Sequence, residues 1–451
     1  MNKLSKYNYF IPEGDRVIYF NGISNEVFSL SQQEHEKMQS LLKEPDEFER
    51  KYPSVFARFL NWGFIVPENK DEVKYLLLRN KEAVFSDKNY MLVINPTLEC
   101  NFGCWYCYEE HPQGRMSGEV MERILKHIKY MVGQERITAL NLSWFGGEPL
   151  LYFDEIVYPI SLHGKKMCEE AGIPFFNSIT TNASLITLDI AEKMGEINLF
   201  DFQITFDGDR KRHDKIRNEH GKPSFERIIK NINVLLARFE NVNITVRINY
   251  DNRTLEICDL REIFERINTK YRKRVHIDFQ RVWQTSPQQE GENAQLKFWF
   301  DMCCDLGYNQ QGILPAFSIG LTHKCYTDRL YHCELNYDGK VYRCTARGYD
   351  DKYVMGELTE EGIIRWDADK MSSRYGRATF ENETCLACRY LPLCMGPCSK
   401  KMEENNWSDS RGVCYLNFVE AAPEQVIVGY YRNKMKYLTE KNVQTLDKSE
   451  K

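Results

Sequence analysis

The chain has 451 residues, 42% of them hydrophobic and 28% charged, and a formal net charge of -5 at pH 7. This charge gives no general attraction to nucleic acid or to an anionic membrane, and no apolar stretch approaches the ~20 residues that a membrane span needs. We therefore expect a cytoplasmic protein with neither nucleic acid nor membrane as a partner. In a reducing compartment, the 15 cysteines indicate metal or redox chemistry rather than disulfides.

Residues 1–85 are predicted to form a winged-helix-like module. Two short strands, Arg16–Asn21 and Glu26–Leu30, precede a helix that Ser31 can open as a capping box with Glu34. A second amphipathic helix follows. Such a module offers a strand edge and a helix groove that can bind an extended peptide, and a simple packing domain is the alternative.

Three cysteines follow the apolar run Met91–Pro96, which is typical of a buried strand. Cys100 and Cys104 are separated by three residues, and Cys104 and Cys107 by two. Three thiolates on one loop can bind a single metal centre but leave its fourth position open, whereas structural zinc sites and ferredoxin clusters use four protein ligands. We therefore predict a metal centre that can bind a further ligand, with inert thiols or zinc as the alternatives.

Residues 86–310 alternate strands with helical patterns, which indicates right-handed βαβ crossovers and a parallel sheet. The six candidate strands are Met91–Pro96, Leu140–Phe145, Phe175–Thr180, Phe202–Phe206, Asn243–Tyr250 and Val275–Arg281. The carboxyl ends of parallel strands lie at one edge of the sheet, where barrel enzymes have their sites. Side chains that follow these strands are therefore candidates for one common site.

Glycine and polar motifs stand at these strand ends. They are Gly146, Gly147, Glu148 and Pro149 after the second strand, Asn182 after the third, Asp207 after the fourth, and Arg247 within the fifth. Paired glycines let a ligand approach the backbone closely, although a simple turn would use them too. A strand arginine needs a charged partner, either a bound carboxylate or an internal salt bridge.

Residues 311–420 are predicted to be a cysteine-rich unit, followed by a tail at 421–451. Its eight cysteines are Cys325, Cys333, Cys344, Cys385, Cys388, Cys394, Cys398 and Cys414. The Asp338-Gly339 turn signal would bring Cys333 and Cys344 together in a hairpin. Two zinc ribbons are the alternative, since CxxC pairs also suit zinc, but the first half of the unit lacks such a pair.

The cysteine loop, with the aromatic Tyr106 directly before its last cysteine, resembles the signature of the radical S-adenosylmethionine enzymes. The resemblance implies an α/β fold with a partial (β/α)6 barrel, in which Cys100, Cys104 and Cys107 hold a [4Fe–4S] cluster. In the family, S-adenosylmethionine binds the open iron and is cleaved reductively to a 5′-deoxyadenosyl radical. The resemblance also implies cofactor contacts at Tyr106, Gly146, Gly147, Glu148, Pro149, Asn182, Asp207 and Arg247. It identifies no catalytic residue.

The cysteine-rich unit resembles the SPASM extension of these enzymes, which carries two auxiliary [4Fe–4S] clusters and would bring the total to three. By the family pattern, the first auxiliary cluster uses Cys325, Cys333, Cys344 and Cys398. The second uses Cys385, Cys388, Cys394 and Cys414. The N-terminal module is similar in position to the peptide-recognition domains of enzymes that modify ribosomally made peptides.

The resemblance implies an oxidoreductase that takes a hydrogen atom from a residue of a ribosomally made precursor peptide and forms a thioether or carbon–carbon crosslink. Its partners would be that peptide, with its leader on the N-terminal module, and a low-potential electron donor such as flavodoxin or ferredoxin. Anaerobic sulfatase maturation, which forms formylglycine, is the first alternative. The Asp that acts there as a base directly after the hairpin cysteine is absent, because Thr345 follows Cys344. A non-catalytic iron–sulfur or zinc protein is the second alternative.

Overall fold

The computed structural model describes residues 1–85, 88–251, 253–282, 284–285, 291–308, 325–346, 348–405, 407, 411–414, 423–432 and 434–435. The chain divides into two compact units. One comprises residues 87–313 and 326–373, and the other comprises residues 1–86, 314–325 and 374–451. The domain boundaries predicted from the sequence, near residues 85, 310 and 420, remain predictions. Among the described residues, no helix has the length and apolar character to cross a membrane.

The six predicted parallel strands are confirmed in the 87–373 unit. They are β6 (Asn89–Ile94), β7 (Ala139–Trp144), β8 (Phe175–Thr181), β9 (Leu199–Phe206), β10 (Asn243–Tyr250) and β11 (Val275–Arg281). Each strand pairs in parallel with its neighbour, in the order β6 to β11 along the sheet. The carboxyl ends of the strands therefore lie along one edge, as the βαβ pattern predicts.

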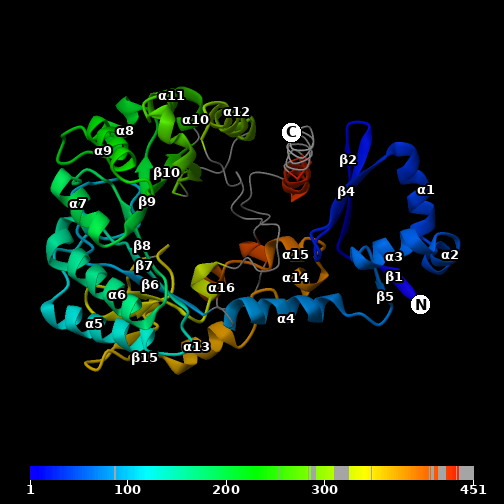
Figure 1. The fold of residues 1–451 in the computed structure, drawn as a ribbon, viewed down its shortest axis with the longest axis horizontal. Coiled ribbons are helices and arrows are strands. Elements are labelled where there is room, and N and C mark those ends of the chain that lie inside the picture. The colour runs from blue at the N-terminus through cyan, green and yellow to red at the C-terminus, as the bar shows by residue number, and fades with distance from the viewer. Residues whose placement is uncertain are drawn as a thin grey trace, which may run out of the picture. The chain divides into compact units, whose positions relative to one another are not determined.

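Helices connect these strands and lie outside them (Figure 1). They are α5 (Gly118–Val132), α6 (Tyr158–Ala171), α7 (Leu188–Glu196), α8 (Arg210–Ile216), α9 (Phe225–Arg238), α10 (Thr254–Ile257), α11 (Arg261–Phe264) and α12 (Glu292–Asp305). In α5, the Ser117 side chain caps the N-terminus by accepting from the backbone of Val120. The apolar residues of α5, among them Ile124 and Ile128, are buried against the sheet in the main core.

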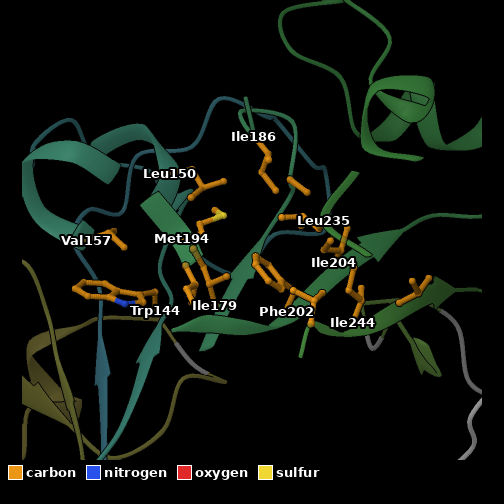
Figure 2. Close-up of a cluster of buried hydrophobic side chains, with 14 of the residues drawn as sticks. Trp144, Leu150, Val157, Ile179, Ile186, Met194, Phe202, Ile204, Leu235 and Ile244 are labelled. Carbon is orange, nitrogen blue, oxygen red and sulfur yellow. The ribbon is translucent and has the colours of Figure 1, made fainter. Parts of the chain in front are cut away.

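The main core lies between the parallel strands and their helices. Figure 2 shows Trp144, Ile179 and Ile204 from neighbouring strands pointing to the same apolar layer. Trp144 is fully buried, and its indole N–H donates to the Ser161 hydroxyl and to the side-chain oxygen of Asn177, both at 3.1 Å. Because its only polar atom is paired there, the ring can fill the core without a desolvation penalty.

The predicted hairpin extends the same sheet. Its strands β12 (His332–Leu335) and β13 (Lys340–Tyr342) are antiparallel, and β12 pairs in parallel with β6. Two more antiparallel strands, β14 (Gly356–Leu358) and β15 (Ile364–Trp366), complete a sheet of ten strands. The sequence predicted the turn but not the pairing with β6, since nothing in a short strand specifies a distant neighbour.

The second unit contains the N-terminal module. Its strands are β1 (Asn2–Leu4), β2 (Asn8–Glu13), β3 (Arg16–Asn21), β4 (Val27–Ser31) and β5 (Ile65–Pro67), and its helices are α1 (Gln32–Leu42), α2 (Pro45–Lys51), α3 (Pro53–Asn61) and α4 (Glu72–Phe85). The capping box of Ser31 and Glu34 is present. Strands β2, β3 and β4 form an antiparallel sheet, and β2, which the sequence analysis did not predict, is one of its edge strands. An edge strand can contain a proline such as Pro12, because one side of the strand needs no hydrogen-bond partner.

Both faces of this three-stranded sheet are covered within its own unit. On one face, Val17 and Tyr19 pack with Phe56 and Phe59 of α3. On the other face, Tyr9, Ile18 and Phe20 pack with Leu393 and Ile427. The unit also contains α14 (Glu383–Ala387), α15 (Leu391–Cys394) and α16 (Ser399–Glu404), and α13 (Ala368–Tyr375) precedes them along the chain. The segments that carry Cys385 to Cys394 therefore share a core with the N-terminal module.

Candidate active site

A pocket opens at the carboxyl ends of β6 to β11 and has about 970 Å³ of empty space, including its open mouth. It is lined by all three cysteines of the loop and by Tyr106, Gly146, Gly147, Glu148, Asn182 and Arg247. The structure thus brings together most of the predicted cofactor residues, which come from strands far apart in the sequence. Asp207 and Pro149 are not among the lining residues, although Asp207 contacts two residues that are, Tyr106 and Arg217.

The cysteine loop follows β6 and presents three free thiols to this pocket. A turn closes between Cys104 and Cys107, where the Cys107 N–H donates to the Cys104 carbonyl at 3.0 Å. Burial, followed by the nearby Glu148 charge, raises the pKa of Cys100 to about 12. Burial also raises the pKa of Cys104 and Cys107. Thiols of this kind become thiolate ligands when a cation offsets the desolvation, so three such thiols on one pocket are a donor set that suits a metal centre. Among the described residues, no three cysteine, histidine or carboxylate side chains are already arranged to hold a metal ion.

Gly146 and Gly147 let the end of β7 pack directly on the cysteine loop. A side chain at Gly147 would place its Cβ 2.0 Å from the Glu99 carbonyl oxygen, and one at Gly146 would place it 2.4 Å from that of Thr97. The Gly147 N–H donates to the Thr97 carbonyl at 3.3 Å, and the Glu148 N–H donates to the Glu99 carbonyl at 2.7 Å. The paired glycines thus admit the chain's own backbone, and they position the loop that carries Cys100.

Glu148 is fully buried and connects the end of β7 to the end of β8. Its carboxylate accepts from the Thr181 hydroxyl at 2.7 Å, the Asn182 N–H at 2.7 Å and the Leu150 N–H at 3.0 Å. Burial raises the pKa of Glu148, against the effect of these three donors. Because Leu150 belongs to the short helix that Pro149 begins (Pro149–Tyr152), Glu148 also caps that helix.

Asn182 connects the third strand to the cysteine loop. Its amide donates to the Asn101 side chain at 2.7 Å, and Asn101 in turn donates to the Ser184 hydroxyl at 3.1 Å. The Asn182 carbonyl accepts from the Ser184 N–H at 2.9 Å, which fixes the orientation of its amide. The residue is thereby a bridge between two walls of the pocket.

Tyr106 belongs to a buried polar network that includes a residue missed by the sequence analysis, Arg217. The Tyr106 hydroxyl donates to the Asp207 carboxylate at 2.8 Å and accepts from Arg217 at 2.8 Å and from Asn249 at 3.0 Å. Arg217 also forms a buried ion pair with Asp207. Asp207 therefore holds Tyr106 and Arg217 in place. Arg217 follows a short helix and has no motif spacing that could have identified it.

Arg247 enters the pocket from β10 and donates to the Asn249 side chain at 2.9 Å. Across the described part of the chain, its guanidinium makes no ion pair, so the internal salt bridge considered from the sequence is absent there. A guanidinium that lines a pocket in this way has free donors for an anionic ligand.

Glu109, just past the last loop cysteine, is a second lining residue that the sequence analysis did not predict. Its side chain is buried, and one carboxylate oxygen has no hydrogen-bond partner among the residues that the structure describes. Burial, followed by the charge of Glu334, raises the pKa of Glu109 to about 8. Near neutral pH this carboxyl group therefore holds a proton in much of the population.

The cysteines predicted for the second auxiliary cluster lie near one another in the other unit. The pKa of Cys394 is raised to about 12 by burial and, beyond that, by the charges of Cys388, Cys385 and Cys414. Backbone N–H groups of Tyr390 and Gly396 point at the sulfurs of Cys388 and Cys394, at 3.4 and 3.5 Å. Hydrogen bonds to ligand sulfurs are a feature of iron–sulfur sites, and two of these four sulfurs accept them here. Of the other predicted set, Cys325 and Cys398 belong to this unit, and Cys333 and Cys344 to the 87–373 unit.

Comparison with known proteins agrees with this geometry. Residues 94–260 match the Radical SAM superfamily. The chain is 23% identical over 381 residues to the serine-type anaerobic sulfatase-maturating enzyme of Bacteroides thetaiotaomicron, covering 74% of this chain and 88% of that one.

Two solved structures share the fold. One is anSMEcpe with bound AdoMet and the Cp18Cys peptide, with a TM-score of 0.56 and 18% identity, covering 76% of this chain and 99% of that one. The other is Streptococcus suis SuiB bound to the precursor peptide SuiA, with a TM-score of 0.50 and 17% identity, covering 92% and 100%. The matched residues 94–260 include most of the residues that line the pocket at the ends of β6 to β11, so this part of the chain is similar to the Radical SAM superfamily.

Proposed function

We propose that this chain is a radical S-adenosylmethionine maturase that modifies a ribosomally made precursor peptide. The observation that supports it most is the convergence of Cys100, Cys104 and Cys107 with Gly147, Asn182 and Arg247 on one pocket. When bound there, a [4Fe–4S] cluster and S-adenosylmethionine would supply a carbon-centred radical that takes a hydrogen atom from the peptide. The chain's own residues bind, orient and shield these groups.

Different lining residues would bind different parts of the cluster and the cofactor. The three cysteines supply ligands on one wall, and the Arg247 guanidinium offers donors to the carboxylate of the cofactor from another wall. Tyr106 is held by Asp207 and Arg217 at a fixed orientation beside Cys107. Glu148 positions the chain at Thr181–Asn182 through the hydrogen bonds that it accepts from the Thr181 hydroxyl and the Asn182 N–H. These contacts are internal, so the pocket keeps its shape before any ligand enters.

The peptide substrate is supported by two features of the chain. SuiB, which shares the fold over nearly its full length, is bound to the precursor peptide SuiA. In this chain, Thr345 follows the hairpin Cys344 where the sulfatase-type enzymes have an Asp. We infer that a leader segment of the peptide binds the N-terminal module and that the product is a thioether or carbon–carbon crosslink. Two auxiliary clusters and a flavodoxin or ferredoxin donor complete the proposal.

Sulfatase maturation is the second candidate, because the sulfatase-maturating enzyme of Bacteroides thetaiotaomicron is similar over 74% of this chain. One experiment separates the two. Anaerobically reconstituted protein is incubated with S-adenosylmethionine, a strong reductant and either a neighbouring precursor peptide or a sulfatase peptide. We expect 5′-deoxyadenosine, and a loss of hydrogen mass only from the precursor peptide. Formylglycine in the sulfatase peptide would favour the alternative, and absence of 5′-deoxyadenosine would refute both.

A further inference from the structure

The segment of residues 209–230, which contains α8 and the first part of α9, is basic in a chain whose overall charge is negative. It holds eight Lys and Arg residues against four Asp and Glu residues, whereas the whole chain has a formal net charge of -5. Its four arginines are neutralised, since each forms an ion pair with a carboxylate: Arg210 with Glu226, Arg212 with Asp251, Arg217 with Asp207 and Arg227 with Glu219. The excess positive charge of the segment is therefore carried by its four lysines.

Three of these lysines, Lys211, Lys215 and Lys222, make up a surface that we call the basic face. Their side chains are exposed, and among the residues that the structure describes, none of the three forms an ion pair. Lys211 and Lys215 are one turn apart on α8, so they lie on the same side of that helix. Asn218 holds the loop with Lys222 beside them, because its side chain donates to the Lys215 carbonyl at 3.2 Å and accepts from the Gly221 N–H at 2.7 Å.

The basic face adjoins the loop that carries the three cysteines. Lys222 forms an antiparallel bridge with Glu219, in which each backbone N–H donates to the other carbonyl, at 3.0 and 3.2 Å. The Glu219 carboxylate accepts from the Asn101 side chain at 3.2 Å, and Asn101 is the neighbour of Cys100 in the cysteine loop. The loop is open to solvent at Gly103, where a side-chain Cβ would meet no atom within 4 Å. A protein that docks on the basic face would therefore lie next to the loop that is predicted to hold the cluster.

We propose that the basic face is the docking surface for a small acidic one-electron carrier protein, of the flavodoxin or ferredoxin kind. This assignment rests on the proposed function, which needs such a donor for the cluster at Cys100, Cys104 and Cys107. In the step itself, one electron leaves the carrier and enters the cluster, and no bond forms or breaks. A chain with net negative charge repels an acidic protein over most of its surface, so a positive surface beside the cysteine loop directs the carrier to the productive position.

The rate of 5′-deoxyadenosine formation with two different reductants provides the first test. Reconstituted full-length protein is compared with the variant that combines Lys211→Glu, Lys215→Glu and Lys222→Glu. With limiting reduced flavodoxin at low ionic strength, the rate should fall at least about tenfold in the variant, because steering by charge changes association rates by about 10- to 1,000-fold. The difference should shrink at high salt, which screens exposed charges. With dithionite, which is too small to need a docking surface, the two rates should be equal. Equal rates with flavodoxin would overturn the proposal.

A matched control variant carries the same change of charge at the opposite edge of the sheet. Lys88, Lys270 and Lys273 are exposed and lie just before β6 and β11, so they are at the amino ends of the strands. Combining Lys88→Glu, Lys270→Glu and Lys273→Glu should leave the flavodoxin-driven rate close to that of wild type. An equal loss in both variants would show a general effect of net charge and overturn the proposal. Where the Glu variant of the basic face does not fold, Gln at the same three positions removes the charge and should lower the rate by a smaller factor.

Binding of oxidised flavodoxin, measured by interferometry over a series of salt concentrations, provides a second test that needs no turnover. Wild type and the control variant should bind with a Kd that rises with salt. The basic-face variant should bind at least about tenfold more weakly at low salt, with little dependence on salt. Unchanged binding in the basic-face variant, together with loss of dithionite-driven peptide modification, would instead assign the face to an acidic part of the peptide and overturn the proposal. If wild type forms no 5′-deoxyadenosine with dithionite, the proposed function fails, whereas the binding measurement still decides the docking surface.

Discussion

Replacing Glu148 should destabilise the fold of the pocket before it affects any direct contact with a cofactor. The carboxylate is fully buried and accepts two backbone N–H groups, of Asn182 and Leu150, and the Thr181 hydroxyl. In Glu148→Ala the two amides lose their acceptor. At about 1–3 kcal/mol for each buried donor left unpaired, the free energy of unfolding should fall by about 2–6 kcal/mol. This is a large share of the 5–15 kcal/mol that is typical of a domain.

Two matched variants separate the contributions at this position. Glu148→Gln keeps one acceptor oxygen for Thr181 and Leu150 and can place its amide group against the Asn182 N–H. The free energy of unfolding should therefore fall by about the value of one lost hydrogen bond. Thr181→Val removes one donor and leaves the charge, and it should cost about 0.5–1.5 kcal/mol. Urea unfolding under anaerobic conditions ranks the three variants, and isothermal titration measures S-adenosylmethionine binding. Unchanged stability in Glu148→Ala, together with strongly weakened binding in Glu148→Gln, would refute the positional role and assign Glu148 a direct ionic contact.

Three other predictions follow from the structure. Burial lowers the pKa of His127 from 6.5 to about 4, so the unfolded chain binds more protons than the folded chain between these pH values. The free energy of unfolding should therefore fall by about 3 kcal/mol as the pH drops from 6.5 to 4. Urea unfolding at a series of pH values measures this loss, which should be absent in His127→Gln. Arg247→Lys should weaken S-adenosylmethionine binding more than it weakens folding, because a guanidinium fork is lost while a charge remains, and equal binding in a titration would contradict the role. Leu60→Asp, on the exposed side of α3, should impair modification of a full-length precursor peptide while iron content stays unchanged, whereas unimpaired modification would argue against leader binding at this helix.

The sequence predicted the parallel strands closely because each is a short apolar run between helical patterns. The bounds of β10 and β11 agree residue for residue, as does β3 in the N-terminal module. The same pattern predicted the edge at which the pocket opens, since parallel strands end at one edge. Short elements with weak patterns were missed, among them β1 and β2, whose pairing depends on distant partners.

The roles of individual side chains were less predictable than their location. Gly146 and Gly147 admit the carbonyls of Thr97 and Glu99, which no local pattern reveals. Arg217 and Glu109 reach the pocket from loops without any motif. A cysteine in a spacing pattern gives no information about the direction of its side chain, and Cys333 points into a core that only the pairing of β12 with β6 creates.

The packing of the N-terminal module also changes how its function can be tested. The Tyr9 hydroxyl donates to the Arg389 carbonyl at 2.5 Å, and Lys6 donates to the Leu386 carbonyl at 2.7 Å. Tyr7 packs with Leu391, and Tyr9 packs with Leu393.

These contacts hold the segment that carries Cys385, Cys388 and Cys394. Deleting residues 1–85 would remove one side of the core around these cysteines, so lost peptide modification in a truncated enzyme would follow from cluster damage as readily as from lost leader binding. Single substitutions on the exposed side of α3 avoid this ambiguity, because its buried side, with Phe56 and Phe59, supports the sheet.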